Sequence, residues 1–448
     1  MIVVLIDKKE HWLEYIWEQF VKINLLQTPS IIKTYHEYMN SQEKGSSDVC
    51  IVEYGKKQLY RDSLFIPQKN DYSTDNYIWI DDRLPVFRDT VVEKEEYDIL
   101  YNAFVHLSRL EERQVASADR LNAYSFNHPR KDFRIWKIPV VNLLFNELEK
   151  KVTARFPSVD FRKQEKPVVE YSHDVDYLEK TIQLRIKQTA FYFFNAGRSV
   201  LHGRFRESLQ NSAHGMWFFV KNSEYWCFDS WTELEEKFNI KSIFYIYSAS
   251  RGNRKYNLKR WLIDPSYDIS MNKKLQDTCR ELMLRGIKIG LHGSFYSGMD
   301  EALFRKEKET LENAINSGVT KSRIHWLNYY DNTTPIILEN CGIHEDSSIA
   351  YNDISGFRAG VASQYNPYDH DNRRAYDFTE IPLVIMDSHI YDYSMHSPEL
   401  LLDWFYDSLS AVKNFTVSID WHQRVLHDDY CWDGAYRNIV ERIKKSIV

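Results

Sequence analysis

Residues 168–180 read VVEYSHDVDYLEK, and this stretch decides the fold of the larger part of the chain. Its apolar beginning predicts a buried strand. Asp174 and Asp176 follow two residues apart, so both side chains leave the strand on the same face, whereas His173 points away from the pair. A buried strand that ends in two carboxylates predicts a metal site, an acid/base pair or an acidic surface loop.

The chain after this stretch alternates between strand and helix patterns. Strands are expected at residues 168–172, 241–247, 287–291, 323–327, 343–347, 381–386 and 415–421. Helices are expected at residues 230–238, 271–285, 300–317, 333–340 and 397–412. This alternation is typical of parallel strands joined by helical crossovers, in either a barrel or an open sheet.

Three of the predicted strands favour the barrel. VVEYSHDVD at 168–176, IKIGLH at 287–292 and FTVSIDWH at 415–422 each have one apolar and one polar face. Strands covered by helices on both sides of an open sheet are apolar on both faces, whereas barrel strands turn one face inward. Each polar row ends in an ionisable residue at the carboxyl end of its strand. That end carries the active site in α/β barrels.

The first part of the chain predicts a smaller α/β domain. Strands are expected at 1–6, 48–54, 63–68 and 76–82, and helices at 10–26, 95–113 and 139–154. The stretch RFPSVDFRKQEKP, which ends at residue 167, predicts a boundary between domains. We therefore expect an N-terminal accessory domain at 1–160 and the barrel at 161–448.

Composition narrows the class of protein. The 448 residues carry a net charge of −6, so nucleic acid is not an expected partner. Five scattered cysteines without a CxxC pair predict a reducing compartment, and the N-terminus does not read as a signal peptide, so we expect a cytoplasmic protein. No apolar run reaches the length of a membrane span. The basic, aromatic run at 180–206 favours a solvated helix face and leaves peripheral membrane contact open.

Further ionisable residues close the other predicted strands. His292 and His422 each end a strand, where an imidazole can bind a metal or transfer a proton. Arg323 and His325 share one face of RIHWL, where they can orient a carboxylate and bind a metal. Each alone reads equally well as a buried polar residue bonded to the backbone. Their gathering at one side of a single barrel favours a site.

These stretches resemble the polysaccharide deacetylase (NodB-homology) superfamily. The similarity is to a subgroup from bacterial surface-polysaccharide systems with an HDVD first motif and an N-terminal accessory domain. It covers about residues 165–435, in the order SHDVDYL, FNIKSIFYIYSAS, DPSYDI, GIKIGLHGSFYSG, SRIHWLNY, CGIHEDSSIAY with GFRAG, EIPLVIMD and SIDWH.

The resemblance implies a distorted (β/α)7 barrel that removes acetyl groups from N-acetylated sugars with a divalent metal, usually zinc. Carried over residue by residue, it implies a catalytic base at Asp174, a metal ligand at Asp176, a metal histidine at His292, an arginine holding the base at Arg323 and a catalytic acid at His422. Two departures stand out. Val175 separates aspartates that are usually adjacent, and Tyr296 stands where the second metal histidine is expected. We expect His325 to be the third metal ligand instead.

The leading hypothesis is a metal-dependent deacetylase acting on a bacterial surface polysaccharide or its lipid-linked precursor. One alternative is a glycosyltransferase in which Asp-x-Asp holds a metal on a nucleotide sugar. The other is an inactive barrel that binds glycans, favoured by the missing second histidine.

Overall fold

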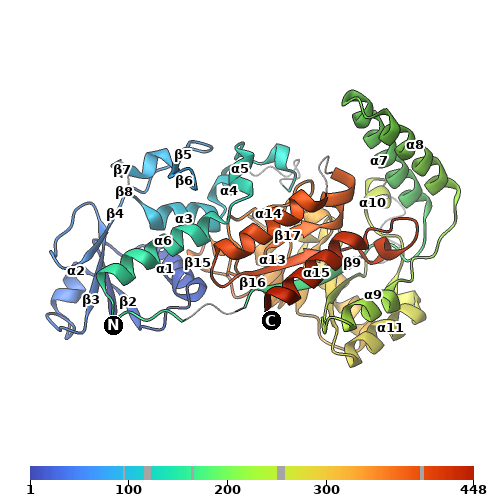
Figure 1. The fold of residues 1–448 in the computed structure, drawn as a ribbon. Helices are drawn as coiled ribbons and strands as arrows, with labels where there is room; N and C mark the ends of the chain where they lie inside the picture. The colour runs from blue at the N-terminus through green and yellow to red at the C-terminus, as the bar shows by residue number, and fades with distance from the viewer. Residues whose placement is uncertain (94–95, 116–122, 163–165, 250–257, 394–397, 448) are drawn as a thin grey trace.

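The computed structural model describes residues 1–448 except 94–95, 116–122, 163–165, 250–257, 394–397 and 448 (Figure 1). An eight-stranded sheet with the order β16-β13-β12-β11-β10-β9-β18-β17 organises the larger part, and its paired strands are parallel. Its strands are β9 (Val168–Val175), β10 (Ile243–Tyr247), β11 (Lys288–Gly293), β12 (Lys321–Ile324), β13 (Glu345–Asp346), β16 (Thr379–Glu380), β17 (Leu383–Met386) and β18 (Thr416–Asp420). The parallel sheet predicted from the sequence is therefore present.

The two edges of this sheet are brought together by the chain itself. β16 lies at one edge and β17 at the other, yet only Ile381 and Pro382 separate them in sequence. Because each residue spans at most about 3.6 Å, the sheet has to curve until its edges approach each other. The fold is an α/β fold whose eight-stranded parallel sheet is consistent with a distorted barrel.

Helices flank the sheet, between successive strands and after the last strand. They are α9 (Phe228–Glu236), α11 (Lys273–Leu284), α12 (Glu301–Ile315), α13 (Thr334–Asn340), α14 (Pro398–Ala411) and α15 (Asp433–Ile447). α12 illustrates how the sequence forms them. Asp300 caps its first turn by accepting the Leu303 N–H at 3.0 Å, and Phe304 and Leu311 bury its apolar face. Asn316, at φ 57°, ends it in the left-handed conformation.

The N-terminal part forms its own four-stranded parallel sheet, in the order β2-β1-β3-β4. Its elements are β1 (Ile2–Ile6), α1 (His11–Ile23), β2 (Ser30–Thr34), α2 (Tyr35–Met39), β3 (Cys50–Gly55), β4 (Leu64–Pro67), β5 (Tyr77–Ile80), β6 (Leu84–Phe87), β7 (Val91–Glu93), β8 (Glu96–Tyr97), α3 (Ile99–Leu107), α4 (Leu110–Val115), α5 (Phe133–Trp136) and α6 (Val140–Arg155). α6 also contacts the larger part, since the Val141 N–H donates to the Gly360 carbonyl at 2.8 Å. The division at 160/161 stays a prediction.

Three sequence-based expectations are wrong in detail. The helix expected at 95–113 is broken by Arg109, whose φ of 54° separates α3 from α4. The strand expected at 323–327 ends at Ile324, because Trp326 adopts φ 59° and turns the chain into a short 3-10 segment. The strand expected at 381–386 begins only after Pro382, which has no N–H for the sheet. The first residues of the helices expected at 95–113 and 397–412, and positions 163–165 of the expected boundary, lie outside the described residues.

A helical hairpin, α7 (Ile182–Leu201) and α8 (Phe205–Val220), projects from the body beside α10 (Leu258–Ile263) (Figure 1). A small pair, β14 (Tyr368–Asp369) and β15 (Arg374–Ala375), completes the described strands. Within the described ranges, no helix combines the length and the apolar character needed to cross a bilayer.

Candidate metal centre and active site

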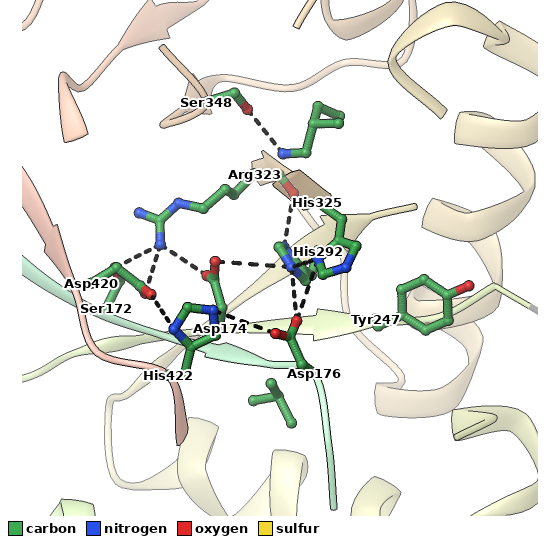
Figure 2. Close-up of polar contacts among 12 residues, drawn as sticks. Ser172, Asp174, Asp176, Tyr247, His292, Arg323, His325, Ser348, Asp420 and His422 are labelled. Atoms are coloured by element: carbon green, nitrogen blue, oxygen red, sulfur yellow. Dashed lines mark hydrogen bonds and ion pairs between the residues drawn. The ribbon is translucent and has the colours of Figure 1, made fainter. Parts of the chain in front are cut away.

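All six residues that the sequence singled out converge at the carboxyl ends of strands of the eight-stranded sheet (Figure 2). They are Asp174, Asp176, His292, Arg323, His325 and His422. In Figure 2 the two aspartates lie between the pair of His292 and His325 on one side and His422 on the other. The neighbouring His173 lies on the opposite face of β9, against Glu235.

Asp176, His292 and His325 form a compact group of possible metal ligands, and all three are buried. Asp176 Oδ1 lies 3.2 Å from His292 Nε2 and 3.4 Å from His325 Nδ1. The two imidazole nitrogens are 2.9 Å apart. One carboxylate and two imidazoles are the ligand set of many catalytic zinc sites.

The hydrogen bonds around these histidines favour a cation. His292 Nδ1 lies 3.1 Å from the Arg323 carbonyl, and His325 Nε2 lies 3.0 Å from the Ile263 carbonyl. A carbonyl oxygen only accepts hydrogen bonds, so His292 Nδ1 and His325 Nε2 each carry a proton. In the neutral rings, the lone pairs are therefore on His292 Nε2 and His325 Nδ1, and these two nitrogens face each other. Asp176 Oδ1 faces the same point, 3.2 Å from His292 Nε2, and makes no hydrogen bond of standard geometry among the described residues. Three converging acceptors fit a divalent cation.

The electrostatics of the group favour an ionised carboxylate beside imidazoles that can bind a metal. Burial lowers the pKa of His325 to about 3, so its ring is neutral near pH 7. Burial would also lower the pKa of His292, but Asp174 and Asp176 outweigh it and raise the pKa, so a metal has to displace a proton from this ring. Burial alone would raise the pKa of Asp176. The neighbouring histidines and the Arg424 guanidinium outweigh this effect and hold the pKa of Asp176 well below its usual range.

Asp174 is held on one side by Arg323. Arg323 Nη1 donates to Asp174 Oδ1 at 2.9 Å, to Asp420 Oδ1 at 2.8 Å and to Ser172 Oγ at 2.9 Å. Burial alone would raise the pKa of Asp174, but the Arg323 guanidinium, followed by the nearby histidines, lowers it. The second oxygen, Oδ2, faces His292 at 3.9 Å and is left for a proton.

Arg323 is itself supported by an aromatic ring from the neighbouring part of the sheet. Its guanidinium lies over the Tyr245 ring, 4.4 Å from the centroid. Gly290 on the neighbouring strand makes room for that ring, because a Cβ there would lie 2.6 Å from the ring carbons. The Tyr245 ring and the carboxylates of Asp174 and Asp420 thus hold this guanidinium in place.

His422 is oriented by a carboxylate that the sequence analysis did not assign. His422 Nδ1 lies 3.0 Å from Asp387 Oδ1, and the backbone N–H of His422 donates to Asp387 Oδ2 at 2.8 Å. Burial alone would lower the pKa of His422, but Asp387 raises it to about 9. The imidazole is therefore protonated near pH 7, with Nε2 directed towards Asp176 Oδ2 at 3.4 Å.

A second unassigned residue, Arg424, donates to Asp176 Oδ2 at 3.0 Å. It follows β18 by four residues, beyond the reach of a strand pattern. The sequence does contain a pattern from which Asp387 and Asp420 could have been predicted. Asp420 shares the polar row that ends in His422, and Asp387 directly follows the strand β17.

A cavity of about 120 Å³ opens beside the cluster. Its lining includes Asp174, Asp176, His325, His422 and Arg424, and also Lys187, Phe191 and Trp326. Burial lowers the pKa of Lys187 to about 8. The volume is below the several hundred Å³ typical of pockets that enclose a whole ligand, so the cavity suits a small substituent of a larger molecule.

Comparisons with known proteins give only loose likenesses. No family model matches the sequence, and no curated protein matches it significantly. Among solved structures, the "Crystal structure of putative polysaccharide deacetylase from Mycobacterium smegmatis" shares 14% identity, with a TM-score of 0.38 over 64% of this chain and 86% of that chain. A CE4-family pseudoenzyme from Bacillus anthracis shares 10% identity, with a TM-score of 0.28 over 63% of each chain. A mutant of that pseudoenzyme with restored enzymatic activity shares 10% identity, with a TM-score of 0.30 over 67% of this chain and 78% of that chain. At these scores the likenesses say nothing about activity, and the geometry of the site is the stronger guide.

Proposed function

We propose that the chain is a metal-dependent deacetylase of the polysaccharide deacetylase superfamily, which hydrolyses acetyl groups on N-acetylated sugars of a bacterial surface polysaccharide or its precursor. Its catalytic part is a (β/α)7 barrel, in which β16 and β17 count as one interrupted strand. Residues 1–160 are an accessory domain of a cytoplasmic protein.

The proposed metal ligands are Asp176 Oδ1, His292 Nε2 and His325 Nδ1. A divalent ion such as zinc supplies Lewis acidity, which lowers the pKa of a bound water and polarises a carbonyl. The two backbone carbonyls of Arg323 and Ile263 fix the tautomer of each neutral histidine, so that the free lone pair is on the ligand nitrogen.

Asp174 is the proposed general base. Water adds to the acetyl carbonyl carbon, and Asp174 Oδ2 accepts the proton that the water loses. Arg323 occupies Oδ1, which leaves Oδ2 for this proton. The lowered pKa of Asp174 keeps the carboxylate ionised and ready to accept at neutral pH.

His422 is the proposed general acid. The carbon–nitrogen bond breaks as His422 Nε2 gives its proton to the departing amine nitrogen, and the products are acetate and the free amino sugar. Asp387 holds the ring through Nδ1 and maintains the protonated form before the reaction. Asp174 and His422 thus supply the two proton transfers that the hydrolysis needs.

The observation that carries this proposal is the set of three buried acceptors, Asp176 Oδ1, His292 Nε2 and His325 Nδ1, that point at one another beside a cavity. The test measures acetate release from N-acetylated chito-oligosaccharides by the purified full-length chain. We expect release, its loss after chelation and its return when zinc is added. A chain that contains no metal and releases no acetate with any divalent ion would overturn the proposal.

One observation favours an inactive glycan-binding barrel as the second candidate. Arg424 already provides Asp176 with a positive partner at 3.0 Å, as does the protonated His422 on the same oxygen. Glycan binding that is indifferent to chelator, without acetate release, would support this candidate. A glycosyltransferase using Asp-x-Asp leaves His292 and His422 without a role.

A further inference from the structure

The helical hairpin of α7 and α8 carries an unusual share of the exposed apolar side chains. Residues 182–220 hold twelve of the twenty-eight large apolar side chains that are exposed among the described residues. They are Ile182, Ile186, Phe193, Phe194, Val200, Leu201, Phe205, Leu209, Met216, Trp217, Phe219 and Val220. Apolar residues scattered singly over a surface need no explanation, whereas a contiguous patch marks a contact.

These side chains follow the helical period in each helix. On α7, the spacings of four, seven and seven residues place one set on a single helix face, namely Ile182, Ile186, Phe193 and Val200. On α8, spacings of four, seven and four residues do the same for Phe205, Leu209, Met216 and Val220. Each helix therefore presents a continuous apolar stripe along its length.

Both stripes lie on the outer side of the hairpin. The contacts of α7 with the body come from its other side, where Gln188 donates to the Asp392 carboxylate and Asn195 donates to the Asp392 carbonyl. α8 packs on α7 through Gly215, where a Cβ would lie 3.1 Å from Tyr192 Cβ. At 3.6 residues per turn, these contact positions place the two stripes on the same outward face.

The charges of the hairpin oppose those of the whole chain. Residues 182–220 contain five basic residues and one acidic residue, whereas the chain as a whole has a net charge of −6. The turn between the helices exposes Arg204 and Arg206 beside Leu201 and Phe205. The single acidic residue, Glu207, lies 3.5 Å from Arg204. The other three, Arg185, Lys187 and Arg198, donate to backbone carbonyls of the chain, so Arg204 and Arg206 are the basic residues at the apolar face. An apolar helical face with basic residues at its edge is typical of a helix that lies in a bilayer interface.

We propose that the outer face of α7 and α8 docks on an anionic phospholipid bilayer. The apolar stripes enter the headgroup region, and Arg204 and Arg206 bind lipid phosphates at the turn. A second copy of this chain would explain the apolar stripes but not the local excess of positive charge, because two identical basic turns repel each other. Docking does not depend on the proposed deacetylase activity.

Docking would set the cavity close to the membrane. The inner side of α7 lines the cavity with Leu184, Lys187, Gln188 and Phe191. A helix with its side chains is about 10 Å across, so a docked chain holds its cavity about one helix diameter from the lipid headgroups. The surface suits a substrate that is itself attached to a lipid.

Flotation with vesicles tests the proposal. The full-length chain is mixed with vesicles of phosphatidylcholine alone or of equimolar phosphatidylcholine and phosphatidylglycerol. We expect binding to the anionic vesicles only. Leu201→Glu combined with Leu209→Glu should lower the bound fraction at least about tenfold, and Arg204→Gln combined with Arg206→Gln should do likewise, since each basic residue contributes appreciably at such a surface.

Leu284→Glu is the matched control. Leu284 is 89% exposed at the end of α11, against 86% for Leu201 and 73% for Leu209, so all three positions accept glutamate without unfolding, which thermal melting verifies. L284E should bind as the wild type does. Absence of flotation by the wild type, equal binding to neutral vesicles, or an equal loss in L284E would overturn the proposal. A dimer in light scattering that L201E/L209E dissociates, without vesicle binding, would overturn it in favour of self-association.

Discussion

The molecule contains two clusters of buried charged side chains, and their comparison shows how a structural cluster differs from a candidate functional site. The first is the candidate metal centre. The second, here called the interface cluster, joins the N-terminal part to the larger part of the chain. It consists of Arg109, Glu112, His128, Asp331 and Arg358. Both clusters bury carboxylates, histidine and arginine side by side.

In the interface cluster, the charges neutralise one another. Arg109 lies 2.8 Å from Glu112 and 3.1 Å from Asp331, and Arg358 lies 2.7 Å from Glu112. Two guanidinium groups therefore face two carboxylates. The adjacent cavity measures about 10 Å³, which is the lower limit for a single water. This cluster holds two parts of the chain together and has no space for a ligand.

In the candidate metal centre, the acceptors outnumber the donors at one point. Asp176 Oδ1, His292 Nε2 and His325 Nδ1 converge, and the neighbouring cavity measures about 120 Å³. A buried charge is thus weak evidence of a site. Unpaired acceptors beside a cavity are stronger evidence, because burying them without a partner costs free energy that a ligand restores.

The largest expected effect concerns the proposed base. Asp174→Asn should reduce acetate release by about 10³-fold or more, because a positioned general base contributes roughly 10²–10⁴-fold and the amide cannot accept the proton. Metal content, measured by mass spectrometry, should be unchanged. Glu170→Gln is the control, since Glu170 lies on the same face of β9, 3.8 Å from Lys321 and away from the cluster. Equal activity of D174N and E170Q would refute the assignment.

This contrast was partly predictable from the sequence. The alternation in 168–176, 287–292 and 415–422 predicts both the inward face and the strand ends, because a period of two is a local property. His325 reaches His292 from the 3-10 segment that follows β12, and Arg424 reaches Asp176 from the 3-10 segment that follows β18. Such positions depend on tertiary contacts, and no local pattern encodes them.

The next effect should appear in stability rather than in chemistry. Glu112→Gln removes the carboxylate between Arg109 and Arg358 and should lower the free energy of unfolding by about 3 kcal/mol, as expected when a buried pair loses one partner. Denaturant titration measures this change. Metal content per folded chain should stay at the wild-type value. A loss of metal in E112Q would contradict the claim that the interface cluster has only a structural role.

His325→Ala should weaken metal binding by at least about 100-fold, since even residues that only orient ligands contribute roughly 10–100-fold. A competition titration with a chromogenic chelator measures the affinity. His389→Ala serves as the control. His389 is also buried and lies 2.9 Å from the Tyr351 carbonyl, outside the proposed ligand set. If H325A binds metal as tightly as H389A, His325 is not a ligand.

The smallest effect concerns the packing under Arg323. Gly290→Ala should lower the free energy of unfolding by about 1–3 kcal/mol, because the added Cβ meets the Tyr245 ring at 2.6 Å. Gly197→Ala, in α7 with nothing near its Cβ position, should instead raise it by about 0.5–1 kcal/mol. Thermal melting compares the two variants. A G290A variant as stable as G197A would show that Gly290 is not needed for the close approach.

The most direct measurement is anomalous X-ray diffraction from crystals of the zinc-loaded chain, recorded on both sides of the zinc absorption edge. The proposed metal centre predicts one strong peak within bonding distance of Asp176 Oδ1, His292 Nε2 and His325 Nδ1, about 2.0–2.2 Å from each. A map without a peak at these three atoms, with Arg424 still paired to Asp176, would contradict the claim that they form a metal centre.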